Sequence, residues 1–336
     1  MILRFVNTSM LALITLLTLT GVYGIVWVFP AWMYELHRAF GWALIALIPW
    51  KAAISLRSLG RGLKPNVDRG VIPVISVALS AATILVLALG VMWAWRLEPS
   101  RLFMNQTVIS WHWIIALVII APFLLHSLWR WPRPKKTDFV SRGGFLRIAG
   151  VAAAGSAGWG ASRALATHRS DPAMRRSATG SRLRGYLTGN DFPITNSVGD
   201  GRTPIEIDAW SLQVGGAVEK PLAITYEEFL ELPQETVTAT IDCTVGWWSV
   251  QRWQGVALRA LLAEAGAHED IRFVRLGAAS GHGQLLPKAE AEGVILATHV
   301  GGSPISHQHG FPLRAVVPSR RGWFWVKWLS EIDLVS

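Results

Sequence analysis

The stretch DCTVGWWSVQRWQGVALRALLAEAG, residues 242–266, holds the single cysteine of this 336-residue chain. Cys243 stands at the end of a strand-like run, TATIDC (238–243), just before a glycine and two tryptophans. Further on, VALRALLAEAG (256–266) spaces apolar residues by three and four and closes on Gly266, which predicts a short helix. A single cysteine forms no internal disulfide, and on its own it is most often a small buried hydrophobic residue. The surroundings of Cys243 therefore decide its role.

From about residue 181 onward, short β-like runs are separated by turn residues. A second helix-like piece, TYEEFLELP (225–233), opens with Thr225 and Glu228 in the spacing of a capping box. Strands and helices are mixed without a strict βαβ alternation, which favours an α+β fold. The runs that we predict as strands are AWSLQVGGAV (209–218), TVTATIDCTV (236–245), IRFVRLGAAS (271–280), FPLRAVVP (311–318) and WFWVKWLSEIDLV (323–335).

The N-terminal part has the composition of a membrane protein. Of all residues 51% are hydrophobic and only 16% are charged, against about 25% charged residues in an average soluble protein. Residues 5–34, 70–95 and 102–129 contain no Asp, Glu, Lys or Arg, and each run exceeds the roughly 20 apolar residues that cross a bilayer. A fourth span is expected over 36–56, where the Lys51 side chain would extend to the interface. We therefore predict an α-helical transmembrane bundle of four spans over residues 1–135.

Basic residues cluster beside these runs, within 51–69 and 130–147, which predicts that those loops are cytoplasmic. The chain is then expected to be a multi-pass protein of the inner cell membrane. The net charge of +10 does not indicate a nucleic-acid partner, because no nucleic-acid motif or aromatic–basic stripe accompanies it.

Residues 136–180 are predicted to be a basic linker to a second domain at 181–336. Within it, SRGGFLR (141–147) resembles the twin-arginine export motif, although Gly143 replaces the second arginine. The weak apolar run IAGVAAAGSAGWGAS (148–162) follows, either as a fifth span or as the apolar region of a signal. A plain basic loop beside the membrane is the alternative. The resemblance implies that the second domain is exported and lies on the extracytoplasmic side.

The stretch 242–266 resembles the molybdopterin-binding domain of the sulfite oxidase family, especially its bacterial methionine-sulfoxide reductase branch. GGSPISHQHGFPLRAVVPSRRGWFWVKWLSEIDLV (301–335) resembles the closing block of that family, and TGNDFPIT (188–195) resembles its first cofactor-contacting loop. The resemblance covers about residues 186–336. In the family, a cysteine at a strand end precedes a tryptophan–serine turn, W-x-G-V and a helix, matched here by Cys243, Trp248, Ser249, Trp253, Gly255 and Val256.

The resemblance implies that the Cys243 thiolate is the one protein ligand of molybdenum in a molybdenum–molybdopterin cofactor. A soft, charge-donating thiolate suits such a metal. Arg314 and Lys327 would suit the phosphate end of the cofactor, as a planar fork and a point charge. The other cofactor contacts that carry over by position are Asn190, Pro193, Ile194, Ala278, His309, Trp325 and Val326.

The chain departs from sulfite oxidases directly after the cysteine. Those enzymes have C-x-G-N-R, where the arginine grips an anion, and this chain has CTVGWWS (243–249). The departure favours reduction of a sulfoxide over oxidation of sulfite. Arg252, Arg320 and Arg321 are candidates to replace the missing arginine.

Three histidines lie in or beside the apolar runs, and ionisable residues in a bilayer are functional candidates. His112 and His126 stand about four helical turns apart. This pattern resembles four-helix b-type cytochromes, including the b561 class. His37 and His112 would clamp one haem b at the outer ends of their helices, while His126 is a weaker candidate at the inner end. Interfacial histidines bonded to backbone or headgroups are the alternative.

Together these features predict a membrane-anchored molybdenum oxidoreductase that exchanges an oxygen atom with a small substrate. Its electrons would pass through haem b to or from a quinone or cytochrome in the membrane. Three alternatives stay open at this stage. One is an enzyme that oxidises sulfite, and another is a b-type cytochrome electron carrier whose C-terminal domain is not catalytic. The third is a non-redox membrane binding protein that keeps the fold.

Overall fold

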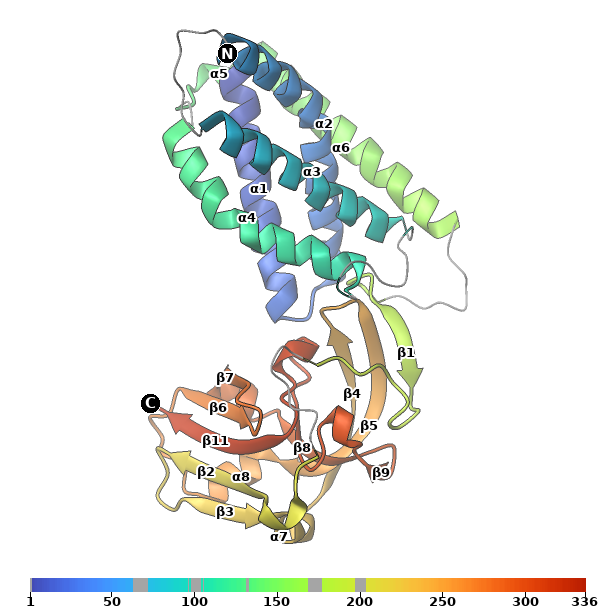
Figure 1. Ribbon diagram of the computed structural model, residues 1–336, viewed down its shortest axis with the longest axis vertical. Helices are drawn as coiled ribbons and strands as arrows, with labels where there is room; N and C mark the ends of the chain where they lie inside the picture. The colour runs from blue at the N-terminus through green and yellow to red at the C-terminus, as the bar shows by residue number, and fades with distance from the viewer. Residues whose placement is uncertain are drawn as a thin grey trace. The chain divides into compact units, whose positions relative to one another are not determined.

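The computed structural model describes residues 2–62, 72–95, 97, 104, 106–130, 133–168, 177–196 and 204–336. Contacts divide the chain into two compact units. The first contains the helices up to residue 180, and the second consists chiefly of Ser181–Ser336. The two units differ in kind, because the first is helical and the second is built on sheets (Figure 1).

Long helices dominate the first unit. Four segments are long and apolar enough to cross a membrane, namely Ile2–Val26, Ala31–Arg57, Val74–Ala94 and Val108–Trp129. The four predicted apolar runs are thus confirmed as helices of spanning length and composition. Part of the predicted basic loop at 51–69 lies outside the described residues. Among those that are described, the helices are α1 (Ile2–Val26), α2 (Ala31–Gly62), α3 (Ile72–Ala94), α4 (Val108–Arg130), α5 (Thr137–Val140) and α6 (Arg142–His168).

Helix α6 contains the weak fifth apolar run and packs along α2 (Figure 1). A side chain added at Gly158 would come within 2.8 Å of the Trp42 ring, so glycine permits the close approach of the two helices. The Trp159 indole donates a hydrogen bond to the Glu35 carboxylate (2.6 Å). Much of the predicted linker is therefore a helix of the first unit, although it is not among the four spanning segments. Two of its glycines, Gly155 and Gly158, lie against Ala43 and Trp42 of α2.

Two sheets form the second unit (Figure 1). One has the order β1-β5-β8-β10, with β4 paired to β5 and β9 paired to β8, and the other has the order β3-β2-β11-β6-β7. The pairs β1–β5 and β2–β11 are parallel and the others antiparallel. The strands are β1 (Arg182–Tyr186), β2 (Ser211–Gly216), β3 (Leu222–Thr225), β4 (Glu235–Cys243), β5 (Trp247–Ala257), β6 (Phe273–Ala278), β7 (Gly283–Pro287), β8 (Ile295–Val300), β9 (Ser303–Pro304), β10 (Arg314–Val316) and β11 (Leu329–Val335).

Short helices connect these strands: α7 (Tyr226–Glu231), α8 (Leu258–Glu264) and α9 (Lys288–Ala291). The predicted capping box of α7 is present, since Glu228 N donates to the Thr225 hydroxyl and Thr225 N donates to the Glu228 carboxylate. Helix α8 matches the predicted helix and is followed by Gly266 at a φ of +63°. The combination of strands and helices confirms a mixed α and β domain.

Each run predicted as a strand contains one, namely β2, β4, β6, β10 or β11. One local expectation was wrong. The pair Trp248–Ser249, expected in a turn after the cysteine, lies inside β5. The chain reverses earlier, over residues 244–246, so that Trp247 already pairs with Cys243. A three-residue loop that closes on a left-handed glycine, Gly246, needs no further residues.

Candidate active site

Cys243 lies at the tip of the β4–β5 hairpin. It is the last residue of β4 and pairs with Trp247, the first residue of β5. Gly246 N donates to the Cys243 carbonyl (3.0 Å), and Gly246 has a φ of +96°, which glycine adopts without strain. The tight turn fixes the backbone around the cysteine, which is only 7% exposed.

The groups around the sulfur oppose each other in their effect on its charge. Burial raises the pKa of the Cys243 thiol, because a buried thiolate loses its hydration. The Val245 N–H, the Thr195 hydroxyl and the Arg321 guanidinium lower this pKa. A desolvated sulfur that still receives hydrogen bonds and lies near a cation is well placed to bind a soft metal ion, which displaces the thiol proton.

Thr195 links the cysteine to a lysine. The Thr195 hydroxyl accepts a hydrogen bond from Trp247 Nε1 (3.0 Å), and the Thr195 carbonyl accepts one from Lys327 Nζ (2.8 Å). Lys327 also donates to Asn196 Oδ1 (2.6 Å) and to the Gln308 carbonyl (2.8 Å). Lys327, predicted at the phosphate end of a cofactor, thus also joins two segments of the site wall.

Two stretches that are far apart in sequence are tied together beside this lysine. Asn190 Nδ2 donates to the Pro304 carbonyl (3.0 Å), and Asn190 Oδ1 accepts from Ser306 N (2.8 Å). His309 Nε2 donates to the Phe192 carbonyl (3.0 Å), and the two rings lie with their centroids 3.9 Å apart. The predicted residues Asn190 and His309 therefore lie in one wall of the site, which is formed by residues 190–192 and 304–309.

His309 is neutral in this wall. Burial, together with the positive charges of Arg314 and Lys327, lowers the pKa of His309 to about 4. Because Nε2 donates to a carbonyl, Nδ1 of the neutral ring accepts a hydrogen bond from the Ser306 hydroxyl (2.8 Å). Both ring nitrogens are thus engaged within the protein.

Arg314 is a buried cation beside the cysteine. Its Cζ lies 5.5 Å from the ring centroid of Trp253 and 5.8 Å from that of Trp325, and its Nη1 donates to the His309 carbonyl (2.7 Å). The pKa of Arg314 is lowered to about 10 because the effect of burial outweighs the opposing effect of the Cys243 thiolate. The buried Arg314 Nε has no hydrogen-bond partner among the described residues. A buried cation with an unused N–H is suited to an anionic ligand.

The remaining predicted residues differ in how deeply they are buried. Ile194 is 52% exposed, whereas Trp325 and Val326 belong to the hydrophobic core. Pro193 is half-buried in the segment that carries Thr195. Ala278 is buried at the end of β6. Cys243, Thr195, His309, Arg314 and Lys327 are joined by direct contacts or through a shared partner.

Comparison with known proteins identifies the second unit. Residues 200–336 match the family model described as "Oxidoreductase molybdopterin binding domain". The uncharacterized oxidoreductase YuiH of Bacillus subtilis (strain 168) is 34% identical over 148 residues, which is 43% of this chain and 74% of YuiH. This chain belongs to the molybdopterin-binding oxidoreductase family. Its molybdopterin-binding domain makes it an oxidoreductase enzyme.

Two relatives of this molybdopterin-binding oxidoreductase have named activities. Mitochondrial sulfite oxidase of Rattus norvegicus is 29% identical over 184 residues, which is 45% of this chain and 32% of that protein. The protein-methionine-sulfoxide reductase catalytic subunit MsrP of Xanthomonas axonopodis pv. citri (strain 306) is 28% identical over 150 residues, 39% of this chain and 47% of that protein. The chain thus spans about a third and about a half of these two relatives. The family match does not extend to the first unit, so the resemblance to b561-type cytochromes stays a prediction.

Two residues of the molybdopterin-binding domain that act on Cys243 were not predicted in that role. Thr195 is the last residue of the loop TGNDFPIT, but the resemblance pointed to its neighbours. Arg321 was considered only as a substitute for the missing anion-gripping arginine. No spacing in the sequence relates either residue to Cys243, because both contacts arise from the fold.

In the first unit, His37 of α2 and His112 of α4 lie side by side. Their ring centroids are 6.3 Å apart, at an interplanar angle of 74°. The Thr20 hydroxyl donates to the Leu16 carbonyl, so His37 Nδ1 donates to Thr20 Oγ1 (2.8 Å). His112 Nδ1 donates to the Val86 carbonyl (2.8 Å). In a neutral imidazole this leaves Nε2 unprotonated in both rings, with a lone pair for a metal.

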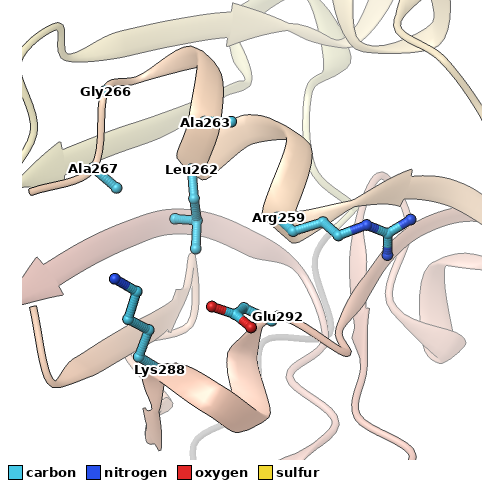
Figure 2. Close-up of a pocket in the computed structure, with 7 residues that line it drawn as sticks. All are labelled: Arg259, Leu262, Ala263, Gly266, Ala267, Lys288 and Glu292. Carbon is cyan, nitrogen blue, oxygen red and sulfur yellow. The ribbon is translucent and has the colours of Figure 1, made fainter. Parts of the chain in front are cut away.

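A shallow pocket of about 250 Å³ lies elsewhere in the molybdopterin-binding domain, between α8 and α9 (Figure 2). It shares no lining residue with the Cys243 cluster, and Figure 2 shows the Arg259 guanidinium directed away from Leu262. The pocket is smaller than the roughly 300–1,000 Å³ of typical ligand sites, so it is not a candidate active site. It is lined by Arg259, Leu262, Ala263, Gly266, Ala267, Lys288 and Glu292.

Proposed function

We propose that this chain is a membrane-anchored molybdenum-cofactor oxidoreductase that removes the oxygen atom from a small sulfoxide. The observation that carries the proposal is the buried pair of Cys243 and Arg314, a soft metal ligand beside a cation whose Nε lacks a partner among the described residues. Membership of the molybdopterin-binding oxidoreductase family supports the same cofactor.

The residues of the site fit this cofactor. Cys243 would supply the thiolate ligand, and Arg314 would direct its free Nε toward an anionic part of the cofactor. The indole N–H groups of Trp248 and Trp253 are also buried without a partner among the described residues, and they offer further donors. We propose that the remaining contacts come from Asn190, Pro193, Ile194, Ala278, His309, Trp325, Val326 and Lys327.

When bound, such a cofactor supplies the two-electron exchange of an oxygen atom. Reduction of a sulfoxide takes up two electrons and two protons and releases a sulfide and water. In this chain Cys243 anchors the cofactor, and Arg314 holds its charge in a water-poor interior. His309 has both nitrogens engaged, so its task is to hold the wall in place rather than to move a proton.

Two of the three candidates for the missing anion-binding arginine, Arg320 and Arg321, are already paired within the protein. Arg320 is paired with Glu290 (2.7 Å), and Arg321 binds Asp242 and two backbone carbonyls. Neither guanidinium is open to a substrate anion. We therefore propose sulfoxide reduction as the activity, with sulfite oxidation as the competing outcome of a substrate screen.

We propose that a haem b is held between His37 and His112. His37 and His112 would supply the imidazole ligands of this haem, whose chemistry would be the transfer of single electrons. Their ring centroids lie 6.3 Å apart, a spacing that ordinary edge-to-face ring pairs share. Both rings donate through Nδ1, which leaves Nε2 as the nitrogen that can bind the haem iron. Gly21 lies next to the His37 ring, and Gly90 lies next to the His112 ring.

The haem would exchange single electrons with a quinone or cytochrome of the membrane. We also propose the inner cell membrane as the location, with the molybdopterin-binding domain on the extracytoplasmic side. The four spanning helices support the membrane, and the twin-arginine-like SRGGFLR (141–147) supports export. His126, on α4, stays a weak proposal for a second haem.

A count of metals tests the proposal. The protein, purified from membranes of a host that makes the cofactor, is expected to contain about one molybdenum and about one iron per chain. In Cys243→Ser, molybdenum and sulfoxide turnover should be lost while the haem spectrum persists, because the thiolate is the ligand. Thr240→Ser, on the exposed side of the same strand, should behave as wild type. Full turnover of Cys243→Ser would contradict the assignment.

A further inference from the structure

The Arg321 side chain grips the backbone at the end of β4. Arg321 Nε donates to the Asp242 carbonyl (3.0 Å), and Arg321 Nη2 donates to the Cys243 carbonyl (3.0 Å). The same Nη2 lies 3.4 Å from Asp242 Oδ1. Both side chains are almost fully buried, with 7% and 10% of their surface exposed. One planar guanidinium thus spans the last two residues of the strand that ends in the cysteine.

The backbone after Arg321 lies against the same strand end. A side chain added at Gly322 would come within 3.3 Å of Cys243 Cα and within 3.5 Å of the Asp242 carbonyl oxygen. The Phe324 N–H donates to the Arg321 carbonyl (2.9 Å), which closes a short turn. The close approach is a second observation, independent of the guanidinium, that this loop is shaped to fit the cysteine.

The loop is itself held in place from the other side. Arg320 forms an ion pair with Glu290 of α9 (2.7 Å), and the Arg320 carbonyl accepts a hydrogen bond from Trp325 Nε1 (3.2 Å). Ser319 also donates to Glu290. Because its contacts with Glu290 and Trp325 restrain this loop, the loop can hold the end of β4 in position.

We propose that Arg321 is a positioning residue that fixes the orientation of the Cys243 thiolate toward the metal. This inference rests on the proposed molybdenum cofactor. The β4–β5 hairpin restrains Cys243 through its pairing with Trp247, the bond from Gly246 N to the cysteine carbonyl and the Val245 N–H at the sulfur. The Arg321 fork adds two bonds to consecutive carbonyls, which restrain rotation of the peptide between them. The orientation of that peptide sets the direction of the Cys243 Cα–Cβ bond and thereby the position of the sulfur.

A purely structural role makes a different prediction. An arginine that only stabilised the fold would, when replaced, lower the melting temperature and leave the sulfur as it was in the molecules that stay folded. A positioning residue, when replaced, changes the cysteine itself. Ligand orientation by groups behind the ligand typically contributes a factor of about 10–100 in activity or metal affinity.

Thiol labelling measures this directly, since Cys243 is the single cysteine of the chain. The full-length protein is made in a host without the cofactor, and its labelling by a small maleimide is followed over time. We expect Arg321→Met to label about tenfold faster than wild type, because the strand end opens more often. Arg321→Lys, which keeps the charge but loses the fork, should lie in between. A wild-type rate in folded Arg321→Met would overturn the proposal.

The matched control is Arg259→Met. Arg259 pairs with Glu235, the first residue of β4, so this variant removes an arginine–carboxylate pair from the opposite, exposed end of the same strand. It should label at the wild-type rate. Circular dichroism confirms that each variant is folded, and Asp242→Asn, which keeps both carbonyl bonds, provides a milder variant if Arg321→Met does not fold.

The holoenzyme gives a second readout. The Mo(V) electron paramagnetic resonance spectrum depends on how the thiolate faces the metal, so its g-values should shift in Arg321→Met and not in Arg259→Met. The kcat should fall about 10- to 100-fold with KM unchanged, because substrate contacts are preserved. Faster labelling with an unchanged Mo(V) spectrum would overturn the positioning role. A wild-type protein without molybdenum would overturn the proposed function instead, and the labelling result would still decide whether Arg321 holds Cys243.

Discussion

The two buried arginines next to Cys243 have different partners. Arg321 is paired with Asp242 and two carbonyls, so its charge is compensated within the protein. Arg314 bonds the His309 carbonyl and keeps an Nε without a partner among the described residues. A buried cation without a counter-charge is costly. The thiolate of Cys243 and an anionic cofactor would together supply the negative charge that Arg314 lacks.

His309 leads to a prediction about pH. Its pKa is about 4 in the folded protein, against 6.5 for an ordinary histidine. Between these values the unfolded chain binds a proton that the folded chain does not. The stabilisation is therefore complete above pH 6.5 and is lost as the pH falls toward 4, by at most about 1.4 kcal/mol per pH unit.

Denaturant unfolding in detergent at several pH values measures this effect. His309→Asn, which removes the titrating group, should flatten the dependence between pH 6.5 and 4. His268→Gln, at an exposed position, should leave it unchanged. An equal slope in His309→Asn and wild type would show that other groups cause the loss.

At the scale of elements, the packing of α6 on α2 depends on some of the glycines of α6. Its glycines occur on the face that meets α2 and also elsewhere, and the two kinds differ in their surroundings. Gly158 faces the Trp42 ring, whereas a side chain at Gly160 would have no atom within 4 Å among the described residues. The contact between α6 and α2 thus depends on particular glycines rather than on a general lack of side chains.

This difference supplies a matched pair of variants. Gly158→Leu should lower the free energy of unfolding by about 1–3 kcal/mol, because the new side chain overlaps the Trp42 ring. Gly160→Leu should be neutral or stabilising by up to about 1 kcal/mol, since leucine is the better helix former. Thermal unfolding of the purified protein measures both. Equal effects would contradict the packing of α6 on α2.

At the scale of the whole molecule, the chain joins a helical unit, with four helices long and apolar enough to cross a membrane, to a molybdopterin-binding oxidoreductase domain. Each unit has its own candidate cofactor site, one at His37 and His112 and the other at Cys243. The two sites share no residue. If both proposals hold, electrons from the membrane reach the substrate only through both cofactors in turn.

His112→Ala separates the two sites. It should abolish the haem spectrum and turnover driven by a membrane quinol, because the iron loses a ligand. Molybdenum content and turnover driven by a soluble dye that reduces the molybdenum centre directly should be kept. Cys243→Ser should lose both kinds of turnover. Quinol-driven turnover in His112→Ala at the wild-type rate would rule out the proposed route.

The sequence by itself determined the features that depend on neighbouring residues. Residues 5–34, 70–95 and 102–129 indicate spanning helices, because length and lack of charge are local properties. The capping box at Thr225 and the helix that ends before Gly266 are local in the same way. Cys243 at a strand end followed from the run before it, and the resemblance around it led to the correct family.

Only the tertiary structure decided which side chains meet at Cys243. Arg321 and Cys243 are 78 positions apart, and Lys327 and Thr195 are 132 positions apart. The Ala- and Gly-rich run at 148–162 likewise suggested a weak span or a signal, and its role emerged from its contact with α2. Such contacts depend on strand register, loop closure and helix packing. These properties are set by the balance of the whole fold, and no pattern along the chain records them.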